Sequence, residues 1–264
     1  MTSTAAQSLD LALVQADLVW SDPEANRDRL GQLMDREPDV DLYVLPETFT
    51  TGFLGDEGAT DEAMETGETL EWMQTQARRR RAALCGSYVV VEDGKRYNRF
   101  VFVDRSGACL GHYDKRHLFG PGGEGERYTA GDALTLIEWM GWRIDLQVCY
   151  DLRFPVWCRN DRNFDLQLYV ANWPSPRTGH WRSLLQARAI ENQAYVIGVN
   201  RVGQDGKDVP YSGCSLAYGP AGEALLQMDD EELVGVVRLE RSTLASYRES
   251  LPFLGDADRF QRRI

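Results

Sequence analysis

Three segments of the sequence carry reactive side chains just beyond apolar runs. Glu47 ends the string Leu45-Pro46-Glu47, Cys149 follows an apolar run at Val148, and Lys115 lies beyond a run that ends at residue 104. Functional side chains tend to lie where a strand meets a loop. Each residue alone is more typical of a structural role, because free cysteine is usually buried and glutamate and lysine are usually solvated.

Together, the three side chains form a complete set for acyl transfer through a thiol. A thiol must lose its proton before it attacks a carbonyl carbon, and a carboxylate can accept that proton if burial raises the carboxylate pKa toward neutrality. A nearby ammonium group then stabilises the oxyanion. Glu47, Lys115 and Cys149 match these roles.

The elements that must position these residues alternate between strands and helices. Helical periodicity predicts helices at residues 25–36, 67–81 and 181–192, and Asp22 with Pro23 marks the start of the first. Asp93-Gly94 predicts a hairpin, and a second hairpin turns around Gly141. Apolar runs predict strands at residues 9–19, 40–45, 83–92, 97–104, 134–139, 143–148, 166–171, 195–200, 216–218, 224–227 and 234–239.

This alternation predicts an α/β protein. Short hairpins inside a strand–helix alternation favour mixed sheets over purely parallel ones. Two mixed sheets packed face to face, with helices outside, would accommodate the pattern. No linker, repeat or change of composition divides the chain, so we expect one domain over residues 1–264.

Three motifs occur in the order glutamate, lysine, cysteine. They are Leu45-Pro46-Glu47, Lys115-Arg116-His117-Leu118-Phe119 and Cys149-Tyr150-Asp151-Leu152-Arg153-Phe154-Pro155. In sequence, order and spacing they resemble the signature regions of the nitrilase, or carbon–nitrogen hydrolase, superfamily. Residues 46–53 and 171–174 further resemble its ω-amidase branch, including bacterial members, and the similarity spans residues 9 to about 251. The resemblance implies a single four-layer α-β-β-α sandwich that hydrolyses an amide through a thioester, without a metal or other cofactor.

The resemblance also assigns roles to single residues. Cys149 is expected to be the nucleophile, Glu47 the general base, and Lys115 the electrostatic partner of the tetrahedral intermediate. The second glutamate of the family has two matches here, because the string Gly-Glu-Gly-Glu blurs the register. We favour Glu124 over Glu126 for this position.

For the substrate, the ω-amidase resemblance implies a small dicarboxylic monoamide with an α-keto group, such as 2-oxoglutaramate or 2-oxosuccinamate. Its distal carboxylate requires a cation, for which Arg153 and Arg116 are candidates, although either could equally form an internal ion pair. Phe119, Trp173 and Tyr150 are expected to wall the pocket, with core packing an equal alternative for Trp173. The backbone N–H of Tyr150 is the expected second oxyanion donor.

Other functions stay open at this point. A nitrilase or a carbamoyl-amide hydrolase would use the same Glu-Lys-Cys triad with a different pocket. A catalytically idle, assembly-forming member of the fold would bind or scaffold without turnover. This last alternative is disfavoured, because a scaffold has no need of all the reactive residues.

Rival reactive patterns are weak. A Cys-His protease would have to draw its base from His112, His117 or His180, and His117 is expected to be structural. No H-E-x-x-H or other clustered ligand set indicates a metal site. The string Gly120-Pro121-Gly122-Gly123 lacks the G-K-[ST] ending of a phosphate loop and predicts a turn beside Lys115, where it could also cover substrate.

The charge balance excludes further classes. With 29 basic and 41 acidic side chains, 29 − 41 gives −12, which disfavours binding to nucleic acid or an anionic membrane. The basic run at residues 78–81 better complements the dipole at a helix end. The five cysteines form no C-x-x-C pair, and neither a signal peptide nor a long apolar run appears, so we expect reduced thiols and a cytoplasmic protein. By resemblance, we expect a homodimer.

Overall fold

The structure is a computed structural model that describes residues 6–37, 39–56 and 61–262. Its first six-stranded sheet has three neighbouring parallel strands, β1 to β3, and every other pair in it is antiparallel. In spatial order, the strands are β14 (Leu233–Glu240), β1 (Ser8–Gln15), β2 (Leu42–Val44), β3 (Ala83–Glu92), β4 (Lys95–Val103) and β5 (Cys109–Asp114).

The second six-stranded sheet repeats this pattern, with β7, β8 and β9 parallel and the outer pairs antiparallel. Its spatial order is β13 (Ala224–Gln227), β12 (Leu216–Tyr218), β9 (Tyr195–Asn200), β8 (Leu166–Ala171), β7 (Trp142–Val148) and β6 (Leu136–Trp139). Strands β10 (Val202–Gln204) and β11 (Pro210–Ser212) form a separate two-stranded sheet. Both large sheets are therefore mixed, as the hairpins predict.

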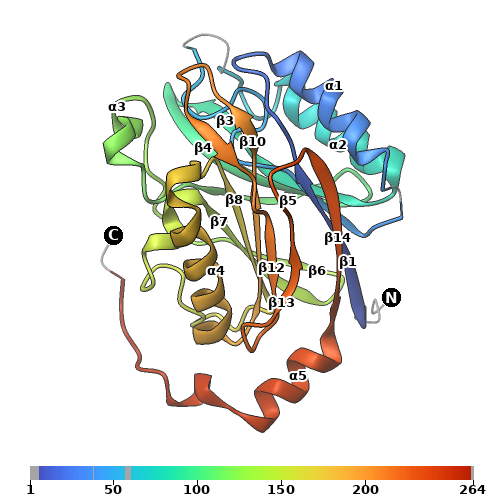
Figure 1. Cartoon of the computed structure of the whole chain (residues 1–264), viewed down its shortest axis with the longest axis vertical. Helices are drawn as coiled ribbons and strands as arrows, with labels where there is room; N and C mark the ends of the chain where they lie inside the picture. Colours follow the sequence, from blue (N-terminus) through green and yellow to red (C-terminus); the bar gives the residue numbers. More distant parts are fainter. Residues whose placement is uncertain (1–5, 38, 57–60, 263–264) are drawn as a thin grey trace.

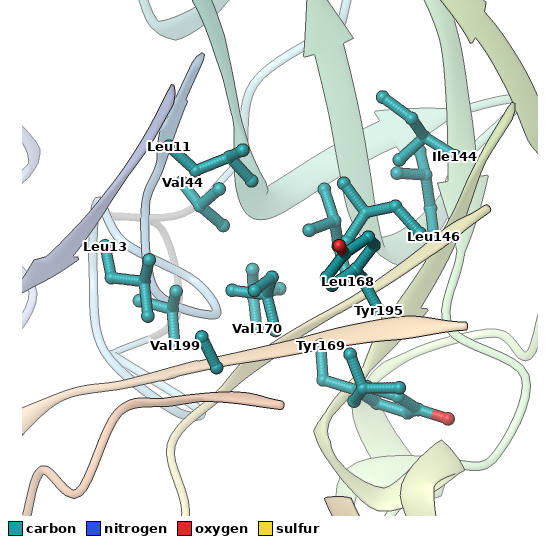
Figure 2. Close-up of a cluster of buried hydrophobic side chains, with 14 of the residues drawn as sticks. Leu11, Leu13, Val44, Ile144, Leu146, Leu168, Tyr169, Val170, Tyr195 and Val199 are labelled. Atoms are coloured by element: carbon teal, nitrogen blue, oxygen red, sulfur yellow. The ribbon is translucent and has the colours of Figure 1, made fainter. Parts of the chain in front are cut away.

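The two sheets pack on each other through alternate side chains of their strands. On β1, Leu11 and Leu13 belong to the core between the sheets, whereas Ala12 and Val14 belong to a core on the other face. Figure 2 shows Leu11, Leu13 and Val44 of the first sheet gathered with side chains of the second. Those facing side chains include Ile144, Leu146, Leu168, Val170 and Val199, all fully buried.

Helices cover the outer faces of the sheets (Figure 1). Helices α1 (Pro23–Met34) and α2 (Glu68–Arg80) pack on the first sheet through residues such as Leu30 and Met73. Helix α4 (Thr178–Asn192) packs on the second through Trp181 and Leu185. The predicted four-layer α-β-β-α sandwich is thus confirmed. Within the described residues, no helix is long and apolar enough to cross a membrane.

Local signals at helix and hairpin ends are confirmed. The Asp22 carboxylate accepts a hydrogen bond of 3.0 Å from the backbone N–H of Ala25, and Pro23 is the first residue of α1. Asp93 and Gly94 join β3 to β4 with φ values of +50° and +72°. Positive φ at both central residues is the geometry in which a two-residue hairpin matches the twist of its strands.

The prediction of a strand at residues 9–19 was too long, because β1 ends at Gln15. Beyond it, the backbone N–H and C=O of Val19 both bond to the side-chain amide of Asn26, at 2.7 Å each. A side chain of α1 therefore satisfies backbone groups that a longer strand would have paired with a neighbour.

Several elements were not predicted. Strand β5 is polar and half-exposed, and β10 and β11 are three residues each, so none carries a long apolar run. The short helix α3 (Glu124–Arg127) contains a glycine, and α5 (Arg241–Ser250) buries only Leu244. Helix α4 begins at Thr178, three residues before the predicted start. In each of these segments the apolar residues show only weak periodicity, which explains why the element was not predicted.

The contact between α4 and β9 depends on Gly198. A Cβ atom at this position would lie 2.4 Å from Leu185 and 2.6 Å from Trp181. We expect Gly198→Ala to lower the free energy of unfolding by about 1–3 kcal/mol through overpacking. Gly31→Ala is the matched control, because no atom lies within 4 Å of the added Cβ in α1. That variant should gain about 0.5–1 kcal/mol, and equal urea midpoints for the two variants would contradict the packing argument.

Candidate functional site

Four polar or reactive side chains meet where strands of the two sheets end. Lys115 directly follows β5, Cys149 directly follows β7, Asn172 directly follows β8, and Glu47 lies three residues beyond β2. The carboxyl ends of neighbouring parallel strands meet at one edge of a sheet, which brings the loops that follow them together. Because the two sheets pack face to face, the loops of the first sheet lie beside those of the second.

Lys115 lies between two carboxylates. Its Nζ atom is 2.8 Å from Oε1 of Glu47, and 3.0 and 2.8 Å from Oε1 and Oε2 of Glu124. All three side chains are fully buried. Of the two predicted matches for the second glutamate, the structure places Glu124 in this cluster, whereas Glu126 is exposed on α3.

The cluster perturbs the titration of its members. Burial opposes a charge on Lys115, but Glu124 and Glu47 outweigh it and raise the pKa of the ammonium well above its usual value. Burial also raises the pKa of the Glu124 carboxyl, against the opposing effect of Lys115. Lys115 therefore stays cationic throughout the neutral range.

Backbone and amide donors fix the remaining positions of Glu47. Oε1 also accepts a hydrogen bond from Nδ2 of Asn98 at 2.9 Å, and Oε2 accepts one from the backbone N–H of Asn172 at 2.7 Å. The amide of Asn98 also reaches Glu124, at 3.3 Å. Glu47 is thus oriented by residues of both sheets, because Asn98 lies on β4 and Asn172 follows β8.

Cys149 forms a sharp turn between β7 and the 3-10 helix η2 (Cys149–Arg153). Its φ is +44°, in the left-handed region that non-glycine residues rarely adopt, and its relative exposure is 9%. Burial, together with the charges of Glu47 and Glu124, raises the pKa of the thiol well above its usual value, although Lys115 opposes the shift. At neutral pH the thiol therefore keeps its proton, and attack requires a base.

Asp151 links the cysteine motif to the lysine motif. Its buried carboxylate accepts hydrogen bonds from the backbone N–H groups of Val148 and His117, at 3.1 and 2.9 Å, and from the hydroxyl of Tyr113 at 2.8 Å. Nδ1 of His117 lies 2.7 Å from the same carboxylate, and the imidazole stacks on Phe154 with centroids 3.7 Å apart. His117 thus has the structural role predicted for it.

A pocket opens over Cys149. It holds about 380 Å³ of space, the solvent at its mouth included. A volume of this order suits a small molecule. The lining residues are Phe53, Phe119, Cys149, Tyr150, Arg153, Asn172, Trp173, Pro174, Arg177 and Tyr211.

Most of the predicted substrate-binding residues line this pocket, namely Arg153, Phe119, Trp173 and Tyr150, but Arg116 does not. The guanidinium group of Arg116 instead donates to the carbonyl of Gly131 at 3.0 Å and lies 5.6 Å from the ring centroid of Trp157. The prediction that Arg116 meets the substrate in this pocket was therefore wrong.

The glycine-rich string beside Lys115 folds as the 3-10 helix η1 (Gly120–Gly122) and leads into α3. A Cβ at Gly122 would lie 2.7 Å from Phe119 and 3.2 Å from Phe53, two residues of the pocket wall. The backbone N–H of Phe119 donates to Glu124 at 2.6 Å. The string therefore seats Phe119 in the pocket and Glu124 in the cluster.

Several residues of the site were not predicted in their structural roles, among them Asn98, Asp151, Asn172 and Arg177. Asn98 is a buried polar residue in the predicted strand 97–104, and this departure from apolar patterning is a usable signal. Asp151 and Asn172 occur in the quoted motifs without an assigned role. Arg177 lies beyond them and carries no sequence signal. Among the described residues, no three His, Cys, Asp or Glu side chains gather as metal ligands.

The sequence matches the family model described as carbon-nitrogen hydrolase over residues 10–249. The chain belongs to the carbon–nitrogen hydrolase family. A structure of a CN-hydrolase superfamily protein from Xanthomonas campestris, with an arsenic adduct in its active site, superimposes with a TM-score of 0.93 at 43% identity. That comparison covers 98% of this chain and 100% of the other.

Two curated relatives show where the chain lies in the carbon–nitrogen hydrolase family. Omega-amidase YafV of Escherichia coli strain K12 is 43% identical over 254 residues, which is 96% of this chain and 98% of the relative. The 2-oxoglutaramate amidase of Bacillus subtilis is 32% identical over 93% of this chain and 96% of its own length.

Asp151 offers a test of how the hydrolase positions its motifs. Asp151→Asn replaces one of the two acceptor oxygens by a donor, so we expect kcat/KM for amide hydrolysis to fall at least about tenfold and stability to fall by about 1–3 kcal/mol. Asp161→Asn is the control, because Asp161 forms an exposed ion pair with Arg262 and should change stability by less than about 1 kcal/mol. Unchanged kcat/KM for Asp151→Asn, at a protein concentration corrected for folding, would contradict the positioning role.

The raised pKa of Cys149 gives a second test. Because the thiolate forms only at high pH, alkylation of Cys149 by iodoacetamide should be slow at pH 7 and still rise above pH 9, by about tenfold per pH unit. Peptide mass spectrometry of quenched samples separates Cys149 from the other four cysteines. A rate that levels off near neutrality would show a preformed thiolate and contradict the argument.

Proposed function

We propose that the protein is an ω-amidase, which hydrolyses the terminal amide of small dicarboxylic monoamides such as 2-oxoglutaramate or 2-oxosuccinamate and releases ammonia. The observation that carries this proposal is the buried cluster of Glu47, Lys115 and Glu124 beside a protonated Cys149 at the floor of a small pocket. The names of the relatives, omega-amidase and 2-oxoglutaramate amidase, support the choice of substrate.

In the first half of the reaction, Glu47 takes the thiol proton as the sulfur of Cys149 attacks the amide carbon. The carbonyl oxygen becomes an oxyanion, which the Lys115 ammonium and the backbone N–H of Tyr150 stabilise. Glu47 then returns the proton to the nitrogen, the C–N bond breaks, and ammonia leaves. A thioester on Cys149 remains.

In the second half, Glu47 removes a proton from water, and the resulting hydroxide attacks the thioester carbon. The same two donors stabilise the second oxyanion. When the C–S bond breaks, the sulfur recovers a proton from Glu47 and the carboxylic acid leaves. The fixed position of Glu47, held by Asn98 and Asn172, supports its use as base in both halves.

We further propose that the enzyme acts in the cytoplasm as a homodimer, without a metal or other cofactor. Five free cysteines are compatible with a reducing compartment. The dimer rests on the family resemblance, in which subunits associate across a helical face.

Ammonia release from 2-oxoglutaramate, glutamine and a small aliphatic nitrile, measured side by side, tests the proposal. We expect 2-oxoglutaramate to have the highest kcat/KM, and a faster nitrile would instead favour a nitrilase. Cys149→Ala should lower kcat by more than about a thousandfold, because the thioester can no longer form. Cys109→Ala is the control, since this half-buried cysteine lies on β5 outside the pocket. Normal turnover by Cys149→Ala would refute the mechanism.

A further inference from the structure

Two guanidinium groups line the pocket, and neither pairs with a carboxylate of the described residues. Arg153 lies with its Cζ atom 4.8 Å from the ring centroid of Trp173, and Arg177 lies 5.5 Å from that of Phe119. Nη2 of Arg153 is 3.2 Å from Nδ1 of His180. Neither arginine forms an ion pair with any residue that the structure describes.

The chain has an excess of acidic side chains, 41 against 29 basic ones. Two buried arginines elsewhere in the chain have carboxylate partners: Arg99 pairs with Asp114 at 2.7 Å, and Arg188 pairs with Glu191 at 2.7 Å. A guanidinium group is always charged and presents a planar fork of donors that matches a carboxylate. Two such groups in one pocket, with no carboxylate of the described residues paired to them, provide a site for an anionic ligand.

The backbone that carries Arg177 is held firmly against the pocket wall. The indole N–H of Trp173 donates to the carbonyl of Arg177 at 2.8 Å, and the hydroxyl of Thr178 donates to the carbonyl of Ser175 at 2.9 Å. Both bonds hold backbone carbonyls of the 3-10 helix η3 (Ser175–Arg177), which follows Pro174 and leads into α4. The Arg177 side chain therefore extends from a rigid segment, so less entropy is lost when it binds a ligand.

We propose that Arg177, together with Arg153, binds the substrate carboxylate that lies remote from the scissile amide, and that Arg177 determines the preference for anionic amides. The proposal rests on the ω-amidase function proposed above and names the residue that selects its substrate class. The scissile amide must reach Cys149, which lines the same pocket as both arginines. A chain of a few carbon atoms then connects the reacting group to the bound carboxylate.

Arg177 gives a cleaner test than Arg153. Arg153 belongs to η2, the same short helix that begins at Cys149, so its substitution also disturbs the nucleophile. Arg177 lies on η3, and within the described residues its guanidinium group lies over the ring of Phe119 and forms no hydrogen bond or ion pair. Its loss leaves the Glu47–Lys115–Cys149 arrangement in place.

The experiment compares an anionic and a neutral amide. We expect Arg177→Gln to lower kcat/KM for 2-oxoglutaramate by about 10- to 100-fold, mainly through KM, because one charge-assisted contact is lost. Hydrolysis of pentanamide, which has the same chain length and no carboxylate, should change less than about twofold. Arg177→Lys keeps the charge without the fork and should recover part of the loss. Arg105→Gln is the matched control, since Arg105 is exposed between β4 and β5 and its loss changes net charge equally.

The outcomes separate this proposal from the function on which it rests. If Arg177→Gln lowers kcat/KM equally for both amides, Arg177 has a structural role. If kcat/KM falls for neither amide, Arg177 does not contact the substrate. Both results overturn the proposal. If the unmodified enzyme prefers pentanamide, the ω-amidase function fails instead. In that case, a second measurement still decides the role of Arg177. Glutarate, a small dicarboxylate, is tested for its ability to slow the alkylation of Cys149 by iodoacetamide. Protection that weakens at least about tenfold in Arg177→Gln, but not in Arg105→Gln, supports a carboxylate site, and equal protection overturns it.

Discussion

The site depends on keeping the Lys115 ammonium charged in a dry interior. Removing an ion from water costs several kcal/mol unless partners compensate for the lost hydration. Here the compensation comes from Glu47 and Glu124, at 2.8 Å each, which arrive from the loop after β2 and from α3. If the loop after β2 or α3 moved, Lys115 would lose one of its two carboxylate partners. The packed core between the sheets therefore serves catalysis directly, because it fixes the strand ends from which the charges extend.

One ammonium between two carboxylates leaves one negative charge in excess, and this excess shapes the chemistry. Asn98 bonds to both carboxylates and offsets part of the excess without adding a charge. The rest of this negative charge acts on Cys149. Burial and the nearby glutamates raise the pKa of its thiol. The nucleophile is thus held as a thiol and gains reactivity only when Glu47 accepts its proton. A thiol in this state resists non-specific oxidation and alkylation, which attack the thiolate.

The sequence predicts the parts of this structure that local chemistry determines. The cap at Asp22 and the hairpin at Asp93-Gly94 follow from single residues, and the layered fold follows from apolar periodicity. The direction of a side chain in an irregular segment has no such signal. Arg116 and Arg177 both lie in or near strings that resemble family motifs, yet only Arg177 lines the pocket, because tertiary contacts decide the path of each loop. Strand β5 was not predicted for a related reason. Its pairing with β4, and not its own composition, makes this segment a strand.

The net charge of −12 also acquires a more specific meaning in this site. A polyanion contacts a wide surface and meets the acidic field everywhere, whereas a small anion inside the pocket interacts mainly with the groups that line it. Charges farther away than about 8–10 Å are largely screened at physiological ionic strength. Arg153 and Arg177 lie within the pocket wall, so their attraction outweighs the distant surface carboxylates for a ligand small enough to enter. An acidic enzyme can therefore select an anionic substrate, because the size of the pocket decides which charges the ligand meets.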